Sequence, residues 1–272
     1  MQKHLTGMKR LQNHGGFERK NIDIYYDNSC YNSPMLTSEQ IENKLDRILL
    51  KVQKPGRYVG GELNSTFKDC EKTQTRVAFV FPDIYDIGVS NVGLKILYDQ
   101  VNQRDDALAE RAYSPWFDME VLMREHGIPL YALESKRPLA CFDLVAFTLP
   151  YETLYTNALN VLDLSGIPVR SLERDETHPI VIAGGHSTMN PEPMHAFIDA
   201  FVIGEGEEVI HDIINVIMSL RAPSEASGRN NLLAHREIVS PRRHGDASGY
   251  RPRNDILMAL AKIPGVYVPQ FY

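Results

Sequence analysis

The chain has 272 residues, 43% of them hydrophobic, which is enough to bury a large core in one domain with attached segments. Its 35 acidic residues outnumber 29 basic ones without any basic stripe, which argues against nucleic-acid binding. No apolar run is long enough to span a bilayer, and the basic amino terminus lacks the apolar core of a signal peptide, so we expect a cytoplasmic protein with no membrane segment.

The cysteines of the chain are few and widely separated. Cys30, Cys70 and Cys141 show none of the close spacing typical of zinc and iron–sulfur sites. An odd, sparse set of cysteines also argues against a secreted disulfide scaffold. The sequence therefore predicts no metal site within this chain and favours a reducing compartment.

The first segments of the chain differ sharply in pattern. Residues 1–34 are polar and aperiodic, which predicts either a disordered leader or sequence upstream of a true start at Met35. Residues 35–75 open on a capping box, in which Thr37 caps a helix and Gln40 reaches back to it. One face of this helix carries Ile41, Leu45, Ile48, Leu49 and Val52. The helix is expected to end near Pro55, before a glycine-rich, partly extended segment.

Strands and helices alternate over residues 76–220. Strands are predicted at Val77–Phe81, Leu108–Tyr113, Leu144–Leu149, Ile180–Ala183 and Ala200–Ile203. Helices are predicted from Val92 through Val101, at Phe117–His126, at Thr153–Leu164 and from Glu207 to Leu220. This alternation predicts an α/β fold of the flavodoxin or Rossmann type, a doubly wound and mostly parallel sheet with flanking helices.

The last part of the chain is polar and then apolar. Residues 221–254 lack an apolar period, which predicts a linker or loop. Residues 255–272 are apolar again. Two interpretations stay open for them: the start of a connection to a further domain, or a tail packed back on its own domain.

The last two predicted strands each end in a glycine turn, Gly184-Gly185 and Gly204-Glu205-Gly206. Glycines at the carboxyl end of a buried strand let the backbone approach a ligand, at the edge where open α/β sheets bind cofactors. Two such turns in consecutive units favour a shared ligand rim. The alternative for each turn is that its glycines only reverse the chain.

Other candidates follow the remaining strand ends. The stretch from Asp86 to Gly93 partly matches a dinucleotide-binding loop, although a turn with Ser90 or Asn91 as helix cap explains it as well. Tyr151 and Glu152 are candidates for a pocket wall. The candidate cofactor-binding residues are Asp86, Gly88, Ser90, Asn91, Tyr151, Glu152, Gly184, Gly185, His186, Ser187, Gly204, Glu205 and Gly206.

Several candidates have a simpler interpretation. His186 either faces a ligand or is solvated, and Glu207 and Glu208 suit the first turn of the following helix. Trp116, the only tryptophan, is expected to pack in the core beside the second strand, with a surface anchor as the alternative. Neither a P-loop, a G-x-S-x-G turn nor a Ser/His/Asp arrangement is recognisable, so no catalytic residue is predicted.

Several ordered blocks together resemble one protein family. The blocks are RYVGGELNS, VAFVFPDIYDIGVSNVGLKILYDQVN, LAERAYSPWFDMEVLMREHGIPLYALESKRPL, FDLVAFTLPYETLYTNALNVLDLSGIPVRS, PIVIAGGHSTMNPEPMHAFIDAFVIGEGEEVI and LAKIPGVYVPQFY. The family is the group of uncharacterised radical SAM proteins with a fused amino-terminal cobalamin-binding-like domain. The resemblance runs from about Met35 to Tyr272.

This resemblance implies a flavodoxin-like domain ahead of a radical SAM barrel. In such enzymes the barrel holds a [4Fe-4S] cluster through a C-x-x-x-C-x-x-C motif, and the cluster reduces S-adenosylmethionine to generate a 5′-deoxyadenosyl radical. The amino-terminal domain would bind a corrinoid. The implied partners are therefore a corrinoid and a radical SAM barrel, fused or separately encoded.

The sequence departs from the family pattern in two places. The three-cysteine motif is absent, so the chain resembles the front portion of a split, truncated or isolated member and should not perform radical chemistry alone. Corrinoid domains with a lower histidine ligand carry D-x-H-x-x-G after the first strand, whereas the loop from Asp86 to Gly93 has no histidine.

Three functional hypotheses follow. The leading one is a corrinoid-binding accessory domain of a radical SAM enzyme. The alternative is a docking domain that has lost corrinoid binding and meets the barrel through its sheet edge and carboxyl-terminal tail. A nucleotide-binding oxidoreductase domain is disfavoured, because the fingerprint loop is incomplete and no acidic ribose partner is evident.

Overall fold

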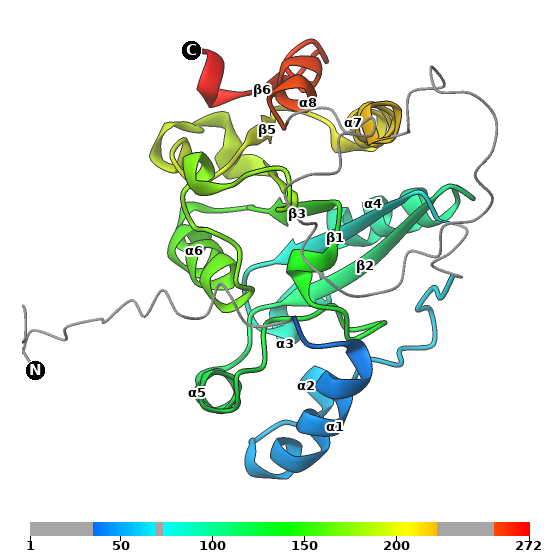
Figure 1. Ribbon diagram of the computed structural model, residues 1–272, viewed down its shortest axis with the longest axis vertical. Coiled ribbons are helices and arrows are strands. Elements are labelled where there is room, and N and C mark those ends of the chain that lie inside the picture. Colours follow the sequence, from blue (N-terminus) through cyan, green and yellow to red (C-terminus); the bar gives the residue numbers. More distant parts are fainter. Residues whose placement is uncertain (1–34, 69–72, 222–252) are drawn as a thin grey trace, which may run out of the picture. The chain divides into compact units, whose positions relative to one another are not determined.

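The computed structural model describes residues 35–68, 73–221 and 253–272, which form a six-stranded sheet with helices on both faces (Figure 1). The predicted leader and residues 222–252 of the predicted linker lie outside the described residues. The strands are β1 Thr75–Phe81, β2 Ala107–Tyr113, β3 Leu144–Thr148, β4 Ile180–Gly184, β5 Ala200–Val202 and β6 Val266–Tyr267. The predicted mostly parallel α/β fold is confirmed.

The strand order is β2-β1-β3-β4-β5-β6. All neighbours pair in parallel except β5 and β6, which are antiparallel. The first five strands therefore have the flavodoxin-like order, whose switch point lies between β1 and β3. Because helices cover both faces, the strands are almost entirely buried and their sequences are continuous apolar runs.

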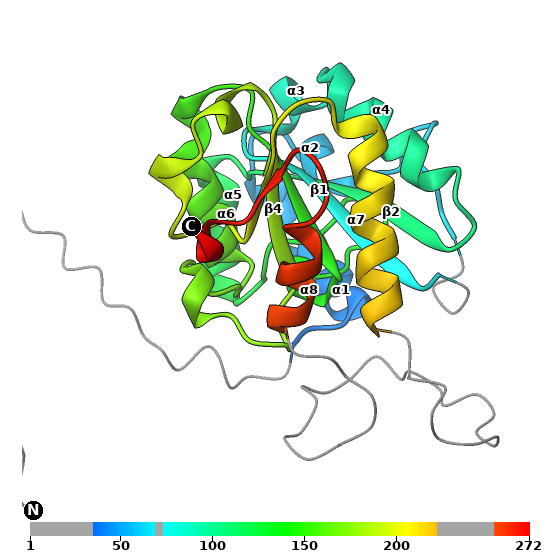
Figure 2. The same ribbon diagram turned by 90° about the horizontal axis from the view of Figure 1, so that it is seen from above.

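The main helices form two layers. Helices α4 (Val92–Asn102) and α7 (Gly206–Arg221) pack on each other, and α8 (Arg253–Leu260) packs on α7. Helices α5 (Phe117–His126) and α6 (Tyr155–Leu164) cover the other face, where Arg124 of α5 pairs with Asp163 of α6 at 2.8 Å. Figure 2 shows α7 and α8 together on one side of the sheet, with α5 and α6 behind it.

The predicted capping box of α1 (Ser38–Ile48) is confirmed. The Thr37 hydroxyl accepts a hydrogen bond from the Gln40 backbone nitrogen at 3.2 Å, and the Gln40 side chain accepts one from the Thr37 nitrogen at 2.9 Å. The helix is shorter than predicted, and a 3₁₀ turn, Leu49–Lys51, continues it. Lys44 holds α1 against α5 by donating to the His126 carbonyl at 2.7 Å.

Short helical turns fill the connections. Two are α-helical, α2 (Gly56–Val59) and α3 (Tyr85–Gly88). The remaining turns are of the 3₁₀ type, at Leu139–Cys141, Glu152–Leu154, Ser171–Glu173, His186–Met189, Glu192–Met194 and Pro269–Phe271.

The outer edge of β2 is closed by side chains. The Asn102 amide accepts from the Ala109 nitrogen at 3.0 Å and donates to the Ala109 carbonyl at 3.1 Å, as a neighbouring strand would. Farther along, the Arg111 nitrogen donates to the Glu134 carboxylate at 2.8 Å, and the Arg111 carbonyl accepts from Leu133 at 2.8 Å. These contacts satisfy backbone groups that an edge strand leaves open.

Residues 56–68, here called the covering segment, lie over this edge. The Arg111 guanidinium donates to Glu134 at 2.7 Å and to Glu62 of the covering segment at 3.0 Å. It also lies 4.7 Å from the ring centroid of Tyr98. Burial alone would lower the pKa of Arg111, but the neighbouring carboxylates raise it, so the guanidinium stays charged.

The carboxyl-terminal tail packs back on the same domain. Strand β6 pairs with β5, and Arg253 at the start of α8 contacts the buried Asp199 carboxylate at 2.5 Å. That carboxylate also meets Arg174 at 3.0 Å and accepts from the Val181 backbone at 2.7 Å. One of the two expectations for the tail is therefore confirmed, and its role as a connection to a further domain stays a prediction.

In the described ranges, no helix has both the length and the apolar composition needed to cross a membrane.

Candidate functional site

The carboxyl ends of β1, β3, β4 and β5 meet at one edge of the sheet, here called the carboxyl edge, because these strands run parallel. The loops that leave it are Pro82–Gly93, Pro150–Thr153, Gly184–Ser187 and Gly204–Glu207. In open α/β sheets, ligands bind at this edge where the strand order reverses. Here the reversal lies between β1 and β3, whose following helices α4 and α6 cover opposite faces.

Asp86 forms ion pairs with one residue of the covering segment and with one residue just before it. Its carboxylate accepts hydrogen bonds from Lys54 at 2.9 Å and from Arg57 at 2.5 Å. The bond from Lys54, which has the larger effect, and the bond from Arg57 lower the pKa of Asp86 to about 2. Asp86 is therefore ionised at neutral pH and pairs with cations of this chain.

The rest of the loop after β1 forms a turn and a helix cap. The Asn91 side chain accepts from the Leu94 nitrogen at 2.8 Å, so the prediction of a cap at this position is confirmed. The Ser90 hydroxyl donates to the Ile87 carbonyl at 2.9 Å. Ile87 keeps 45% of its surface exposed, so this loop presents an apolar side chain to solvent.

Gly88 lies beneath this loop rather than on its surface. A β-carbon there would lie 2.5 Å from the Tyr113 ring and 3.0 Å from Phe81. The Tyr113 ring in turn meets Tyr85 edge-on, with centroids 5.3 Å apart. Gly88 thus allows α3 to pack over the ends of β1 and β2.

Tyr151 and Glu152 follow β3 and are both exposed, Tyr151 by 40%. Glu152 begins a 3₁₀ turn that leads into α6. Their role as a pocket wall stays a prediction.

The glycine turn after β4 packs against the end of β3. Gly185 has φ +110°, and a β-carbon there would lie 2.7 Å from the Leu149 carbonyl oxygen. Ser187 donates to the same carbonyl, from its nitrogen at 3.1 Å and its hydroxyl at 2.8 Å, while Gly184 accepts from the Leu149 nitrogen at 2.7 Å. His186 projects from this turn as an exposed residue.

The turn after β5 is more open. Gly204 has φ +114°, and a β-carbon there would meet no atom within 4 Å. Gly204 and Glu205 are exposed, and Gly206 begins α7. Glu207 and Glu208 lie in the first helical turn, as their simpler interpretation had it, where negative charge is favourable.

Hydrogen bonds join these loops in two groups. Tyr155 at the start of α6 donates to the Ser187 carbonyl at 3.2 Å, and Thr188 donates to the Val202 carbonyl at 2.9 Å, which links the ends of β3, β4 and β5. On the other side of the switch point, the Ser114 nitrogen after β2 donates to the Asp83 carbonyl after β1 at 3.0 Å. The predicted residues thus share one edge, and their joint contact with a ligand stays a prediction.

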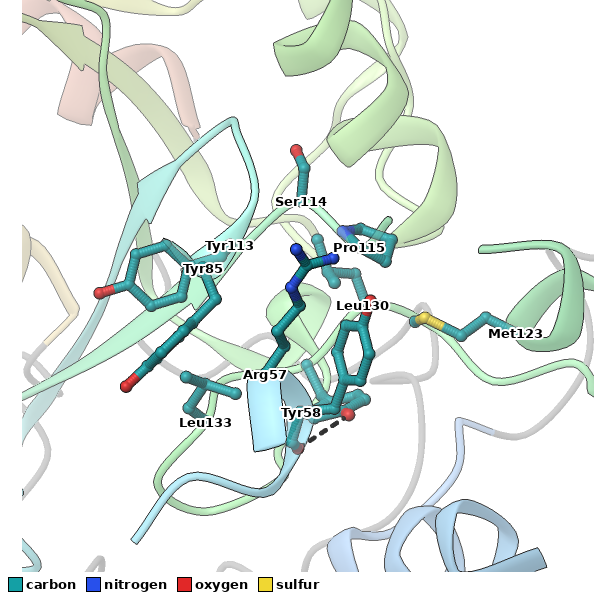
Figure 3. Close-up of a pocket in the computed structure, with 10 residues that line it drawn as sticks. Arg57, Tyr58, Tyr85, Tyr113, Ser114, Pro115, Met123, Leu130 and Leu133 are labelled. Carbon is teal, nitrogen blue, oxygen red and sulfur yellow. Dashed lines mark hydrogen bonds between the residues drawn. The ribbon is translucent and has the colours of Figure 1, made fainter. Parts of the chain in front are cut away.

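A tyrosine-rich cleft beside this edge was not expected from the sequence. Figure 3 shows the Arg57 guanidinium in its middle, with Tyr85 and Tyr113 on one side and Met123 on the other. The cleft is narrow, with a cavity of about 10 Å³, which is room for about one water molecule. Burial raises the pKa of Tyr113, which keeps this phenol protonated. No local motif predicts the cleft, because the covering segment brings Arg57 to β2 from a distant part of the chain.

Trp116 directly follows Ser114 and Pro115, which line this cleft. The expectation that it packs in the core is wrong, because it is 42% exposed. Its backbone nitrogen donates to the Tyr58 hydroxyl at 3.1 Å, and the Arg57 guanidinium lies 5.8 Å from its ring centroid. The neighbouring Phe117 is 68% exposed, so α5 begins with two aromatic rings at the surface.

Within the described part of the chain, no cluster of three or more histidine, cysteine or acidic side chains is arranged to hold a metal ion. Cys141 belongs to the described part of the chain, and burial raises the pKa of its thiol. Cys30 and Cys70 lie outside the described residues.

Comparisons with known proteins give two matches and one negative result. A family model described as "Radical SAM proteins, N-terminal" matches residues 93–242, just over half of the chain. An uncharacterized protein of Methanocaldococcus jannaschii is 25% identical over 142 residues, which are 51% of this chain and 26% of the relative. The match thus spans about a quarter of that relative's length. No solved structure matches significantly.

Proposed function

Because the chain belongs to the family of amino-terminal regions of radical SAM proteins, we propose that it is a corrinoid-binding accessory domain that works with a radical SAM barrel. The corrinoid would lie across the carboxyl edge, over the loops that follow β1, β3, β4 and β5. One observation carries the proposal: parallel pairing brings these loops to a single edge, on both sides of the switch point.

The exposed groups of this edge suit a large ring with amide side chains. Gly185 and Gly204 are exposed at two neighbouring strand ends, and Gly204, where a β-carbon would meet open space, lets the amide groups of a ligand approach its backbone. Ile87, Tyr151 and Met189 are 45%, 40% and 66% exposed, and they offer apolar surface to the ring. Burial of such surface contributes about 25 cal/mol per Å².

The chain's own residues limit the chemistry that it supplies. A corrinoid provides a cobalt centre that in some relatives carries a methyl group. The loop from Asp86 to Gly93 offers no histidine to the lower face of the cobalt, so its role would be to hold the ring. The three cysteines do not form the cluster motif, so the [4Fe-4S] cluster and S-adenosylmethionine belong to the partner barrel in this proposal.

Hydroxocobalamin binding tests the proposal directly. Gel filtration of the full chain mixed with hydroxocobalamin should give protein and cobalamin absorbance in the same peak. Met189→Glu and Tyr151→Glu place charge on the apolar part of the edge and should weaken binding. Leu172→Glu is the matched control, because Leu172 is 86% exposed and lies near the opposite end of β5. A folded protein that never co-elutes with cobalamin contradicts the proposal.

A second candidate function is a docking domain that binds no corrinoid. Two observations favour it: Gly88 and Gly185 face the protein's own atoms, and Trp116 and Phe117 are exposed beside the carboxyl edge. Docking by strand addition is disfavoured, since Asn102 and Glu134 close β2 and strand β6 covers β5. A purified radical SAM barrel should pull down the wild-type chain but not Phe117→Glu. This result, together with a wild-type chain that does not bind cobalamin, would support the docking function.

A further inference from the structure

A groove lies near the amino-terminal end of β5, away from the carboxyl edge. Its walls are the segment Arg170–Leu172, the segment from His195 to Asp199 just before β5, and the carboxyl-terminal tail. Its cavity measures about 180 Å³ and is open to solvent on one side. Because β5 runs from the groove toward the carboxyl edge, the groove is separate from the corrinoid site proposed above.

The groove is apolar in most of its lining and polar at a few points. Leu172, Ile198, Leu257 and Pro269 supply apolar surface. This mixture is typical of sites for small molecules, which bury an apolar body and orient it by a few polar groups.

The polar side of the groove contains one arginine and one carboxylate. Arg170 lines it, and among the described residues no carboxylate or carbonyl pairs with the Arg170 guanidinium. The lining contains one carboxylate, Asp199, which is held between Arg174 and Arg253. Because Arg174 and Arg253 are buried and already paired with Asp199, the Arg170 guanidinium is left to pair with an occupant of the groove.

We propose that this groove binds a small amphiphilic anion, a molecule with a compact apolar body and one anionic head group. The apolar body lies against Leu172, Ile198 and Leu257, and the head group pairs with Arg170. A guanidinium suits this role because it stays charged and offers several donors in one plane. The occupant is defined by this chemistry, a single negative charge on an apolar body.

The tail forms one wall of the groove, which links binding to stability. Leu257 belongs to α8, and Pro269 and Gln270 follow β6. An occupant therefore bridges the tail to the segments that precede β4 and β5. Because a ligand that binds only the folded state raises its stability, occupancy should raise the melting temperature.

Two matched fluorescent probes test the proposal with the full chain. 8-Anilinonaphthalene-1-sulfonate carries an anionic head, and N-phenyl-1-naphthylamine has the same apolar body without it. The wild-type protein should bind the anionic probe more tightly. Arg170→Glu should weaken binding of the anionic probe about tenfold, as expected for one charge-assisted contact, and leave the neutral probe almost unchanged.

Two further variants separate the groove from other apolar surfaces. Ala196→Trp fills the groove and should abolish the saturable binding of both probes. Arg47→Glu, the same charge reversal on α1, should change neither affinity. Circular dichroism verifies that each variant is folded. Excess hydroxocobalamin should not displace the probe, which keeps this result separate from the corrinoid proposal. Anionic-probe binding that is insensitive to Arg170→Glu or to Ala196→Trp overturns the proposal.

Discussion

Gly88 lies so close to Tyr113 that a β-carbon at this position would be 2.5 Å from its ring. Gly88→Ala should therefore destabilise the domain by about 1–3 kcal/mol, the usual cost of overpacking a buried contact. Gly93→Ala is the control, since Gly93 is an exposed helical glycine and the same change there should be neutral or stabilising. Denaturant unfolding measures both, and equal effects at the two positions would contradict the packing argument.

The glycine turns after β4 and β5 should respond differently to the same substitution. Gly185 and Gly204 both have positive φ, so alanine costs about 1–3 kcal/mol of backbone strain at either position. At Gly185 the new β-carbon also meets the Leu149 backbone, whereas at Gly204 it meets open space. Gly185→Ala should therefore be the more damaging variant by at least about 1 kcal/mol in chemical denaturation. Equal losses would show that the contact with Leu149 relaxes freely.

The contact of Asp199 with two arginines should be a point of high sensitivity. Asp199→Ala leaves Arg174 and Arg253 buried without their carboxylate and should destabilise the domain by about 3–5 kcal/mol. Burial already lowers the pKa of Arg174, which indicates how unfavourable an unpaired charge is there. Asp163→Ala, which removes a partly exposed partner of Arg124, should cost less than about 1 kcal/mol. Thermal unfolding of both variants provides the comparison.

Through Asp86, the stability of the folded domain should depend on pH in a direction that its lowered pKa defines. Its pKa in the folded state is lowered from 3.8 to about 2 by bonds from Lys54 and Arg57. The contribution of this group to stability is therefore full above pH 4 and is lost as the pH falls from about 4 toward 2. The stability difference between the wild type and Asp86→Asn should shrink over this interval.

Carbon-detected NMR titration of the Asp86 carboxyl measures the same property directly. Because Asp86 and Lys54 are exposed to solvent, added salt should screen their interaction and move the pKa of Asp86 back toward its usual value. A midpoint near 3.8 at low salt would contradict the observed contacts.

Much of the fold could be predicted because its signals are local. Apolar runs bounded by turns gave β1 and β3 to within two residues at each end, and Thr37 with Gln40 marked the start of α1. The short elements α2 and α3 are below the length at which helical periodicity is visible. Strand β6 has two residues, and its antiparallel pairing with β5 depends on a tertiary contact.

The candidate site divides along the same line. Because parallel strands end at the same edge, the common edge of the glycine turns could be predicted from the sequence. The capping role of Asn91 could be predicted as well. The exposure of Trp116 agrees with the alternative of a surface position, whereas the placement of Arg57 beside its ring was not predictable, because the covering segment brings it there. Burial of Gly88 likewise depends on Tyr113, a residue of another strand.

The side-chain closure of β2 has a consequence for self-association. With the backbone of Ala109 bonded to Asn102, and that of Arg111 bonded to Glu134 and Leu133, β2 offers a poor template on which a second molecule could polymerise strand by strand. At the other end of the sheet, β6 is two residues long and presents too short a ribbon for fibril growth. Concentrated solutions of the folded domain should therefore resist cross-β aggregation, and any oligomer should form through side chains instead.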